Sequence, residues 1–301
     1  MTELALYEAV PLAHAVVDRV AEDVGVRILL IKGPVAVAQG LRRHRSSVDV
    51  DVLVDPGRRR HLAAALIELG WADEDPRRSP TVLPRHSLTL RHPTWPCELD
   101  LHDYFPGFFL DHQELFERLW ERRTRADVAE REVWAPDLLA HALVLALHSL
   151  RDPYDAAKRA DLEELVKNVP GLFGDEDRQA LAELARDLGA ADTAAPFLVE
   201  IGCPPVGRGT TSVEDLRAWR LRTEPLDRTA VGWIEELRRL PKRSWPRYLW
   251  YAAVLSEKEL RLQDPSMPEG SAAVWAARRK RLRRGLTATP SAVRSVRRSG
   301  R

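Results

Sequence analysis

The sequence predicts an α+β protein, in which a small mixed sheet with its helices occupies the first 125 residues and a helical region follows. Strand-like stretches, either apolar throughout or alternating with period two, occur almost entirely before residue 110. From residue 135 onward the apolar residues recur at helical spacing instead. Strands followed by a run of helices are typical of this fold class. We therefore expect an α/β domain at 1–125, a helical domain at 126–277 and a flexible basic tail at 278–301.

The elements of the first domain follow from local patterns. Residues 4–24 show helical apolar spacing, and the apolar stretch 27–31 predicts a buried strand that ends at Lys32-Gly33. Pro34 suits the first turn of a helix, which we expect over 34–43. Alternation predicts a strand at 47–54, and the break at Pro56-Gly57 precedes an amphipathic helix at 58–70. Two further strands are expected at 86–92 and 97–104.

The second half of the chain is expected to be almost entirely helical. One short strand is predicted at 131–135. The apolar spacing then predicts helices over 135–151, 153–169, 174–200, 213–224, 228–240 and 244–264.

Composition places the chain among globular proteins of a reducing compartment. It has 301 residues, of which 45% are hydrophobic and 30% charged. The two cysteines, Cys97 and Cys203, are too few for a disulfide framework or a cysteine metal site. An apolar run of about 18 residues, which a membrane span requires, is absent. We expect a cytoplasmic protein.

The net charge of +1 conceals an asymmetry between the body and the C-terminal end. Residues 278–301 contain ten basic residues and no acidic ones, so the 36 basic and 45 acidic residues before them leave a net charge of −9. A basic tail can bind nucleic acid, whose phosphates attract arginine and lysine. The alternative is a solvated end without a partner.

Two predicted strands carry acidic side chains on one face. Residues i and i+2 of a strand share a face, so Asp49 and Asp51 point the same way, as do Glu98, Asp100 and His102. If the strands are neighbours, three or four carboxylates converge and repel one another. Magnesium ions would offset that repulsion, and a pair of them can promote phosphoryl displacement. The alternative is the wet face of a half-buried sheet, with His102 as a supporting polar residue.

The turn after the first strand suits an anion. Lys32 and Gly33 lie between a strand and the start of a helix, where backbone N–H groups and a lysine charge favour phosphate. The alternative for Lys32 is a solvated strand end. His141 and His148 share a helix face about 10.5 Å apart, too far to bind one metal, so packed or hydrogen-bonded histidines are expected.

The order and spacing of these motifs are more specific than any one of them. An apolar strand, Lys32-Gly33, an arginine (Arg45) four residues before Asp49-Val50-Asp51, Gly70-Trp71 after an amphipathic helix, and Asp100-Leu101-His102 follow one another. This arrangement resembles the bacterial uncharacterised nucleotidyltransferase family of the polymerase-β-like nucleotidyltransferase superfamily. The resemblance covers roughly residues 25–170. It implies a nucleotidyltransferase core ahead of the helical region.

The resemblance also implies roles for individual residues. Asp49, Asp51 and Asp100 would bind metal, with two Mg²⁺ ions as the cofactor. Asp100 would alternatively act as the base toward the acceptor, and Glu98 competes with it for that role. Lys32 and Gly33 would contact the triphosphate, and Arg45 would contact phosphate or anchor the carboxylates. Pro34 departs from the superfamily's usual loop, because it removes a backbone N–H that could bind phosphate.

Three functions are compatible with these motifs. The first is a magnesium-dependent enzyme that moves a nucleoside monophosphate from an NTP to a hydroxyl or amine of a small molecule, peptide or RNA end. The second is a non-catalytic NTP-binding regulatory module, which need not retain Asp49, Asp51 and Asp100. The third is a toxin-like transferase that modifies tRNA, which the basic tail favours and the acidic body opposes.

Overall fold

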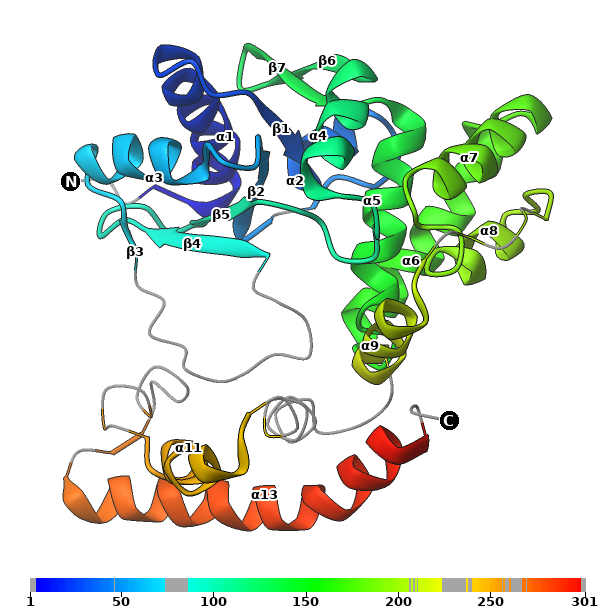
Figure 1. The fold of residues 1–301 in the computed structure, drawn as a ribbon. Helices are drawn as coiled ribbons and strands as arrows, with labels where there is room; N and C mark the ends of the chain where they lie inside the picture. The colour runs from blue at the N-terminus through cyan, green and yellow to red at the C-terminus, as the bar shows by residue number, and fades with distance from the viewer. Residues whose placement is uncertain are drawn as a thin grey trace. The chain divides into compact units, whose positions relative to one another are not determined.

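The computed structural model describes most of the chain. The described residues are 4–45, 47–73, 86–205, 207, 209, 211–223, 237, 240–255, 257, 260, 267–268 and 270–298. The chain divides into two units, one of residues 1–75 and 85–216 and the other of residues 76–84 and 217–301 (Figure 1). The domain boundaries expected at residues 125 and 277 stay predictions.

A five-stranded sheet lies in the first unit. Its order is β1-β2-β5-β4-β3, and only β2 and β5 run parallel; the other neighbours are antiparallel. The strands are β1 (Ile28–Ile31), β2 (Asp49–Val54), β3 (Ala72–Asp73), β4 (Ser87–Arg91) and β5 (Glu98–His102). The predicted α+β class and mixed sheet are thus confirmed, although β3 was not predicted. The predicted strand patterns at 27–31, 47–54, 86–92 and 97–104 correspond to β1, β2, β4 and β5.

One face of this sheet carries the apolar core. Val50, Val52 and Val54 of β2 are buried in one cluster with side chains of α1 (Leu6–Asp23) and α3 (Arg59–Glu68). Burial of valine, leucine and isoleucine here removes apolar surface from water, which is the main stabilising contribution to such a layer. Because side chains alternate along a strand, Asp49 and Asp51 are left on the opposite face.

The helices beside that opposite face begin at aspartate caps. Asp137 accepts a hydrogen bond from Ala140 N at the start of α5 (Leu138–Leu150), and Asp155 accepts from the first-turn amides of α6 (Ala156–Asn168). Both helices agree with the predicted stretches 135–151 and 153–169. α2 (Gly33–Ala38) is shorter than the predicted helix, and Gly40 follows it with φ +74°. A positive φ is incompatible with helix continuation.

Several elements after residue 110 depart from the sequence expectation. α4 (His112–Glu121) and β6 (Arg123–Val128) were not predicted; β6 pairs with β7 (Arg131–Pro136), which corresponds to the strand expected at 131–135. The helix predicted over 174–200 is wrong, because two helices occupy it, α7 (Asp175–Asp187) and α8 (Ala195–Glu200), separated near Gly189 (φ +68°). The first unit also contains the short 3-10 helix η1 (Val169–Gly171).

The last part of the chain is helical where it is described. α9 (Val213–Thr223) matches the predicted helix, and α11 (Trp245–Ala253) lies within the one expected at 244–264, directly after the short 3-10 helix η2 (Lys242–Ser244). The helix expected at 228–240 lies almost wholly outside the described residues. α13 (Ser271–Arg298) includes most of the expected basic tail. None of the described helices combines the length and apolar character needed to cross a bilayer.

Candidate active site

The centre of the site is a pair of aspartates on the two parallel strands. Asp51 of β2 is paired in register with Asp100 of β5, so the two side chains are neighbours on the polar face of the sheet. Asp51 is only 3% exposed. Asp51, Asp100 and His102 each offer a ligand atom, and these atoms lie within 4.8 Å of one another. Two carboxylates and one imidazole are therefore gathered on the sheet face where metal binding was expected.

Lys32 supplies a positive charge to this cluster. Its Nζ lies 2.5 Å from Asp51 Oδ1, and His102 Nε2 donates to the same oxygen over 2.8 Å. Burial alone would raise the pKa of Asp51, but Lys32 and His102 hold that pKa well below its usual value. The strand pattern predicted repulsion among the carboxylates, which bound magnesium ions would offset. In the structure, a lysine and a histidine offset part of that repulsion.

Asp100 has a different environment from its neighbour. Thr89 of β4 donates from Oγ1 to Asp100 Oδ1 at 2.5 Å. Burial is the main influence and raises the pKa of Asp100, while the threonine bond acts in the opposite direction. A carboxylate with a raised pKa is a better proton acceptor than an ordinary one. Two adjacent aspartates thus have opposite shifts, which is typical of sites with distinct chemical roles.

The backbone at Lys32 is strained. Its φ of 61° and ψ of −153° fall in a region that is populated almost only by glycine. The Lys32 N–H donates to His141 Nε2 over 2.7 Å. His141 Nδ1 in turn donates to Gln39 Oε1 (2.5 Å), and Gln39 Nε2 donates to the carbonyl of Pro136 (2.8 Å). This chain of bonds fixes the turn, and burial lowers the pKa of His141 to about 3, so the ring is neutral.

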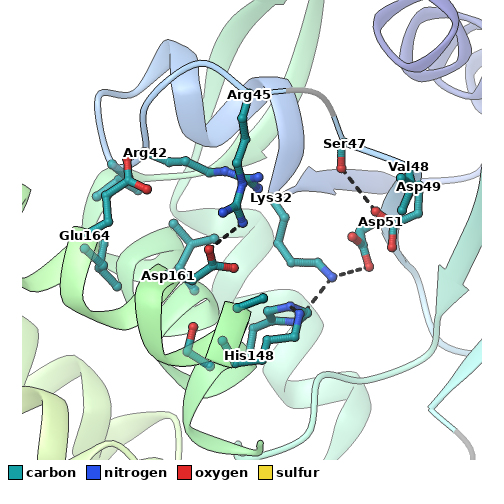
Figure 2. A pocket seen from close by; sticks show the side chains of 16 residues that line it. Lys32, Arg42, Arg45, Ser47, Val48, Asp49, Asp51, His148, Asp161 and Glu164 are labelled. Carbon is teal, nitrogen blue, oxygen red and sulfur yellow. Dashed lines mark hydrogen bonds and ion pairs between the residues drawn. The ribbon is translucent and has the colours of Figure 1, made fainter. Parts of the chain in front are cut away.

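A cavity of about 350 Å³ opens beside Lys32 and Asp51 (Figure 2). It lies between the polar end of β2, the loop after α2, and helices α5 and α6. The lining residues are Lys32, Leu41, Arg42, Arg45, Ser47, Val48, Asp49, Asp51, Leu145, His148, Ser149, Ala157, Lys158, Asp161, Glu164 and Leu165. This volume lies within the range of small-ligand sites. Its mixture of lysine, arginine and carboxylate side chains suits a polar, charged ligand.

The loop that forms one wall is tied to α6. Arg45 pairs with Asp161 at 2.5 Å, and Glu164 Oε1 accepts from the Arg43 N–H at 2.6 Å. Figure 2 shows Arg45 directed from the loop toward Asp161, while Lys32 extends between Asp51 and His148. The family resemblance implied that Arg45 would contact phosphate or anchor the carboxylates of the strands. Its partner in the structure is instead a carboxylate of α6.

The other predicted site residues, Gly33, Asp49 and Glu98, lie outside the cluster of Asp51, Asp100 and His102. Gly33 directly follows Lys32 with φ +44°, at the start of α2. Asp49 lies at the cavity, but its Oδ1 accepts from Ser47 Oγ at 3.1 Å, and it is not part of the 4.8 Å cluster. Glu98 pairs with Arg91 of β4 at 2.6 Å. The structure therefore brings together Lys32, Asp51 and Asp100, and it engages Asp49 and Glu98 elsewhere.

Two residues of the site were given no definite role by the sequence. His148 and Lys158 contact each other through Nε2 and Nζ, and both line the cavity. The seven-residue spacing between His141 and His148 indicated that they share a helix face, but it did not indicate which side chain would contact His148. The signal available for Lys158 was composition, because it is one of only six lysines in an arginine-rich chain.

Comparison with known proteins identifies the family. The family described as uncharacterised nucleotidyltransferases matches residues 14–199, which include every residue of the candidate active site. The chain belongs to this family. It is a nucleotidyltransferase by family, as the motif order indicated. No curated protein matches the chain in sequence.

Solved structures with nucleotidyltransferase descriptions are similar in part. A lincosamide antibiotic adenylyltransferase, LnuA, solved with lincomycin, is 16% identical and has a TM-score of 0.36, covering 53% of this chain and 96% of its own. The antibiotic-resistance factor ANT(2'')-Ia is 15% identical with a TM-score of 0.40, covering 62% and 96%. An antigenic nucleotidyltransferase-like protein from Paracoccidioides brasiliensis is 13% identical with a TM-score of 0.37, covering 63% and 93%.

Proposed function

We propose that this protein transfers a nucleoside monophosphate from an NTP to a hydroxyl or amine group of an acceptor, with a divalent cation, Mg²⁺, as cofactor. One observation carries the proposal: Asp51 and Asp100 lie side by side on parallel strands, next to Lys32 and a cavity of about 350 Å³. Membership of the nucleotidyltransferase family supports it.

The residues present suit a divalent cation. Carboxylate oxygens are the ligands that Mg²⁺ prefers, and Asp51 and Asp100 offer them within the 4.8 Å cluster. His102 holds Asp51 through its Nε2 and so orients the carboxylate, a common role for residues behind a metal ligand. A second ion would require Asp49 as a ligand. The Asp49 carboxylate would then exchange its hydrogen bond from Ser47 for a bond to the metal. When bound, the metal would stabilise negative charge on the attacking and leaving oxygens.

The chain's own residues then have distinct tasks. Lys32 would contact the triphosphate through its ammonium group, with Gly33 allowing close approach of the backbone. Pro34 offers no N–H, so the side chain of Lys32 has the larger share of phosphate binding. Asp100, whose pKa is raised by burial, would accept the proton of the acceptor. Arg45 would remain with Asp161 and hold the cavity wall in place.

The acceptor oxygen or nitrogen forms a bond to the α-phosphorus, and the bond from that phosphorus to the oxygen bridging the β-phosphate breaks. Pyrophosphate leaves with the electron pair, and the acceptor's proton passes to Asp100. The acceptor belongs to one of three classes: a small molecule, a peptide or an RNA end. A cytoplasmic setting, where NTPs are abundant and Cys97 and Cys203 stay reduced, is part of the proposal.

The direct test is pyrophosphate release with adduct detection. The full chain would be incubated with Mg²⁺ and each NTP over acceptor panels of the three classes, and nucleotide adducts would be sought by mass spectrometry. Asp100→Asn should abolish adduct formation, whereas Asp103→Asn, whose partner Arg59 lies outside the cluster, should retain it. Adducts that persist in Asp100→Asn would overturn the proposal. NTP binding without turnover on any acceptor would favour the non-catalytic regulatory module instead.

A further inference from the structure

The second unit of the chain is strongly basic. It consists of residues 76–84 and 217–301, which include 23 basic and 8 acidic residues and so carry a net charge of +15. The first unit includes 23 basic and 37 acidic residues, a net charge of −14. The overall charge of +1 therefore conceals two units of opposite sign. Because the first unit repels a polyanion, affinity for one has to come from the second.

The positive charge of the second unit is concentrated in α13. Residues 271–298 include nine basic residues and no acidic one. Arg279, Lys280 and Arg283 are exposed. Arg279 and Arg283 are one helical turn apart, about 6 Å along the axis, which is close to the spacing of successive phosphates in a nucleic acid strand. Cations clustered along a helix in this way are typical of a surface that contacts a phosphodiester backbone.

One face of α13 combines these cations with exposed apolar side chains. Four residues at positions i, i+4, i+7 and i+8 share this face: Trp275, Arg279, Leu282 and Arg283. Trp275 is 60% exposed and Leu282 is 44% exposed. The Arg278 guanidinium lies 5.2 Å from the centre of the Trp275 ring. An exposed indole beside guanidinium groups is suited to stacking with a nucleic acid base.

The opposite face of α13 is occupied by the core of its own unit. Val274 is buried in a cluster with Leu255, Leu260 and Met267. The Arg278 guanidinium also donates to the carbonyl of Leu255 over 2.9 Å. A helix that lies on a bilayer inserts a broad apolar face into it. In α13 the apolar face is used for packing, and the exposed apolar side chains lie among charged ones, so the exposed face suits a nucleic acid better than a membrane.

A second exposed tryptophan lies on α11, which contacts α13 within the same unit (Figure 1). Trp250 of α11 is 67% exposed. Lys242 and Arg243, in the short helix η2 directly before α11, are exposed as well. Two helices in contact therefore each combine an exposed indole with nearby cations.

We propose that α11 and α13 form a binding surface for a single-stranded nucleic acid. The phosphates contact Arg279, Lys280 and Arg283, and the bases stack on Trp275 and Trp250. RNA and DNA single strands share this chemistry, and the experiment below distinguishes them. One consequence rests on the proposed function: among its three acceptor classes, this surface selects an RNA end.

The test measures binding of two labelled single strands of about 12 nucleotides, one RNA and one DNA of the same mixed sequence, to the full chain by fluorescence anisotropy. EDTA keeps divalent ions from the acidic first unit. Wild type should bind with an affinity that falls steeply as salt is raised. Trp275→Ala should weaken binding about tenfold, as expected for the loss of one stacked base, and Trp275→Phe should retain most of the affinity.

Two matched triple variants test the contribution of charge. The first removes three exposed cations of α13: Arg279→Gln, Lys280→Gln and Arg283→Gln. The control changes the net charge equally by removing three exposed cations of the first unit: Arg58→Gln, Arg60→Gln and Lys167→Gln. In the α13 variant, the slope of log affinity against log salt should fall by about 2, since each phosphate contact contributes about 0.7 for a single strand. The control should match wild type, and circular dichroism would verify that both variants keep their helices.

Equal affinity of both strands for wild type and for the α13 variant would overturn the binding surface. So would binding of the chain to vesicles of phosphatidylglycerol when neither strand binds. RNA bound at least as tightly as DNA would support an RNA end as the acceptor, and a clear preference for DNA would overturn that choice.

The result is separable from the proposed function. Asp100→Asn should bind the strands like wild type, because the surface lies on α11 and α13. Failure of strand binding would leave small-molecule and peptide acceptors for the transfer reaction. Strand binding that depends on Trp275 and on the α13 cations would support the surface even if no acceptor formed a nucleotide adduct.

Discussion

The strained turn at Lys32 predicts an inverted order of stability between two substitutions. Lys32→Gly and Lys32→Ala both remove the side chain, so both lose the ion pair with Asp51 and the contact with His148. They differ only in the backbone. At most positions glycine is less stable than alanine by about 0.5–1 kcal/mol, because the unfolded glycine chain has more freedom to lose.

At Lys32 the folded backbone reverses that order. A φ of 61° with ψ of −153° costs a residue with a Cβ about 1–3 kcal/mol and costs glycine almost nothing. Subtracting glycine's entropic penalty of about 0.5–1 kcal/mol leaves Lys32→Gly more stable than Lys32→Ala by about 1 kcal/mol. The hydrogen bond from the residue 32 N–H to His141 is available to both variants.

The assay is urea unfolding of the two variants side by side, followed by circular dichroism and by tryptophan fluorescence. Coincident transitions from the two probes would justify a two-state free energy for the comparison. A Lys32→Gly variant less stable than Lys32→Ala would show that the turn is unstrained. It would refute the view that the hydrogen-bonded chain of His141 and Gln39 holds Lys32 in a costly conformation.

Two further predictions concern the same surroundings. The folded pKa of His141 is about 3, below its ordinary value of 6.5, so the unfolded state alone binds a proton as pH falls from 6.5 toward 3. His141 should therefore cost the fold about 2 kcal/mol at pH 5 relative to pH 7. In the His141→Leu variant, the unfolding free energy measured in urea should therefore fall less steeply between pH 7 and pH 5 than in wild type. The same pH dependence in both proteins would contradict a neutral buried ring. In EDTA, Asp51→Asn should destabilise the chain by about 3–5 kcal/mol, because Lys32 stays buried without its partner. The double variant Lys32→Met/Asp51→Asn should regain most of that loss; equal instability of single and double variants would mean that the pair is not coupled.

Local patterns predicted the sheet well because its strands follow simple rules. Alternation in β2 and β5 placed the aspartates on one face, and their convergence then depended only on the two strands being neighbours. The structure makes β2 and β5 adjacent and parallel, and the register sets Asp51 opposite Asp100. β6 escaped prediction because arginines at positions 123 and 125 give it no apolar alternation along its first half. It pairs with β7 through the two-residue turn Ala129-Glu130, in which both residues have positive φ. Neither is the glycine, asparagine or aspartate that usually marks such a turn in a sequence.

The electrostatics of the site could not be inferred from the sequence. Spacing along the chain gave no indication that Lys32 would reach Asp51, or that His148 would lie between two lysines more than a hundred residues apart. The sequence therefore predicted a cluster of mutually repelling acids. Ion pairs between side chains on different elements depend on rotamers and burial, which only the folded arrangement fixes. For the same reason, the sequence could not show that Asp49 and Asp51, which occupy equivalent positions in the alternating pattern of β2, have different partners.

The decisive measurement is metal binding at the paired aspartates Asp51 and Asp100. Mn²⁺, used as a spectroscopic substitute for Mg²⁺, would be titrated into wild type, Asp51→Asn, Asp100→Asn and the control Asp103→Asn, with a non-hydrolysable NTP analogue present, and bound ion would be counted by electron paramagnetic resonance. We expect at least one bound ion in wild type and in Asp103→Asn, and at least tenfold weaker binding in the other two variants. Equal binding in all four proteins would contradict it, because the carboxylates gathered by β2 and β5 would then not hold the metal.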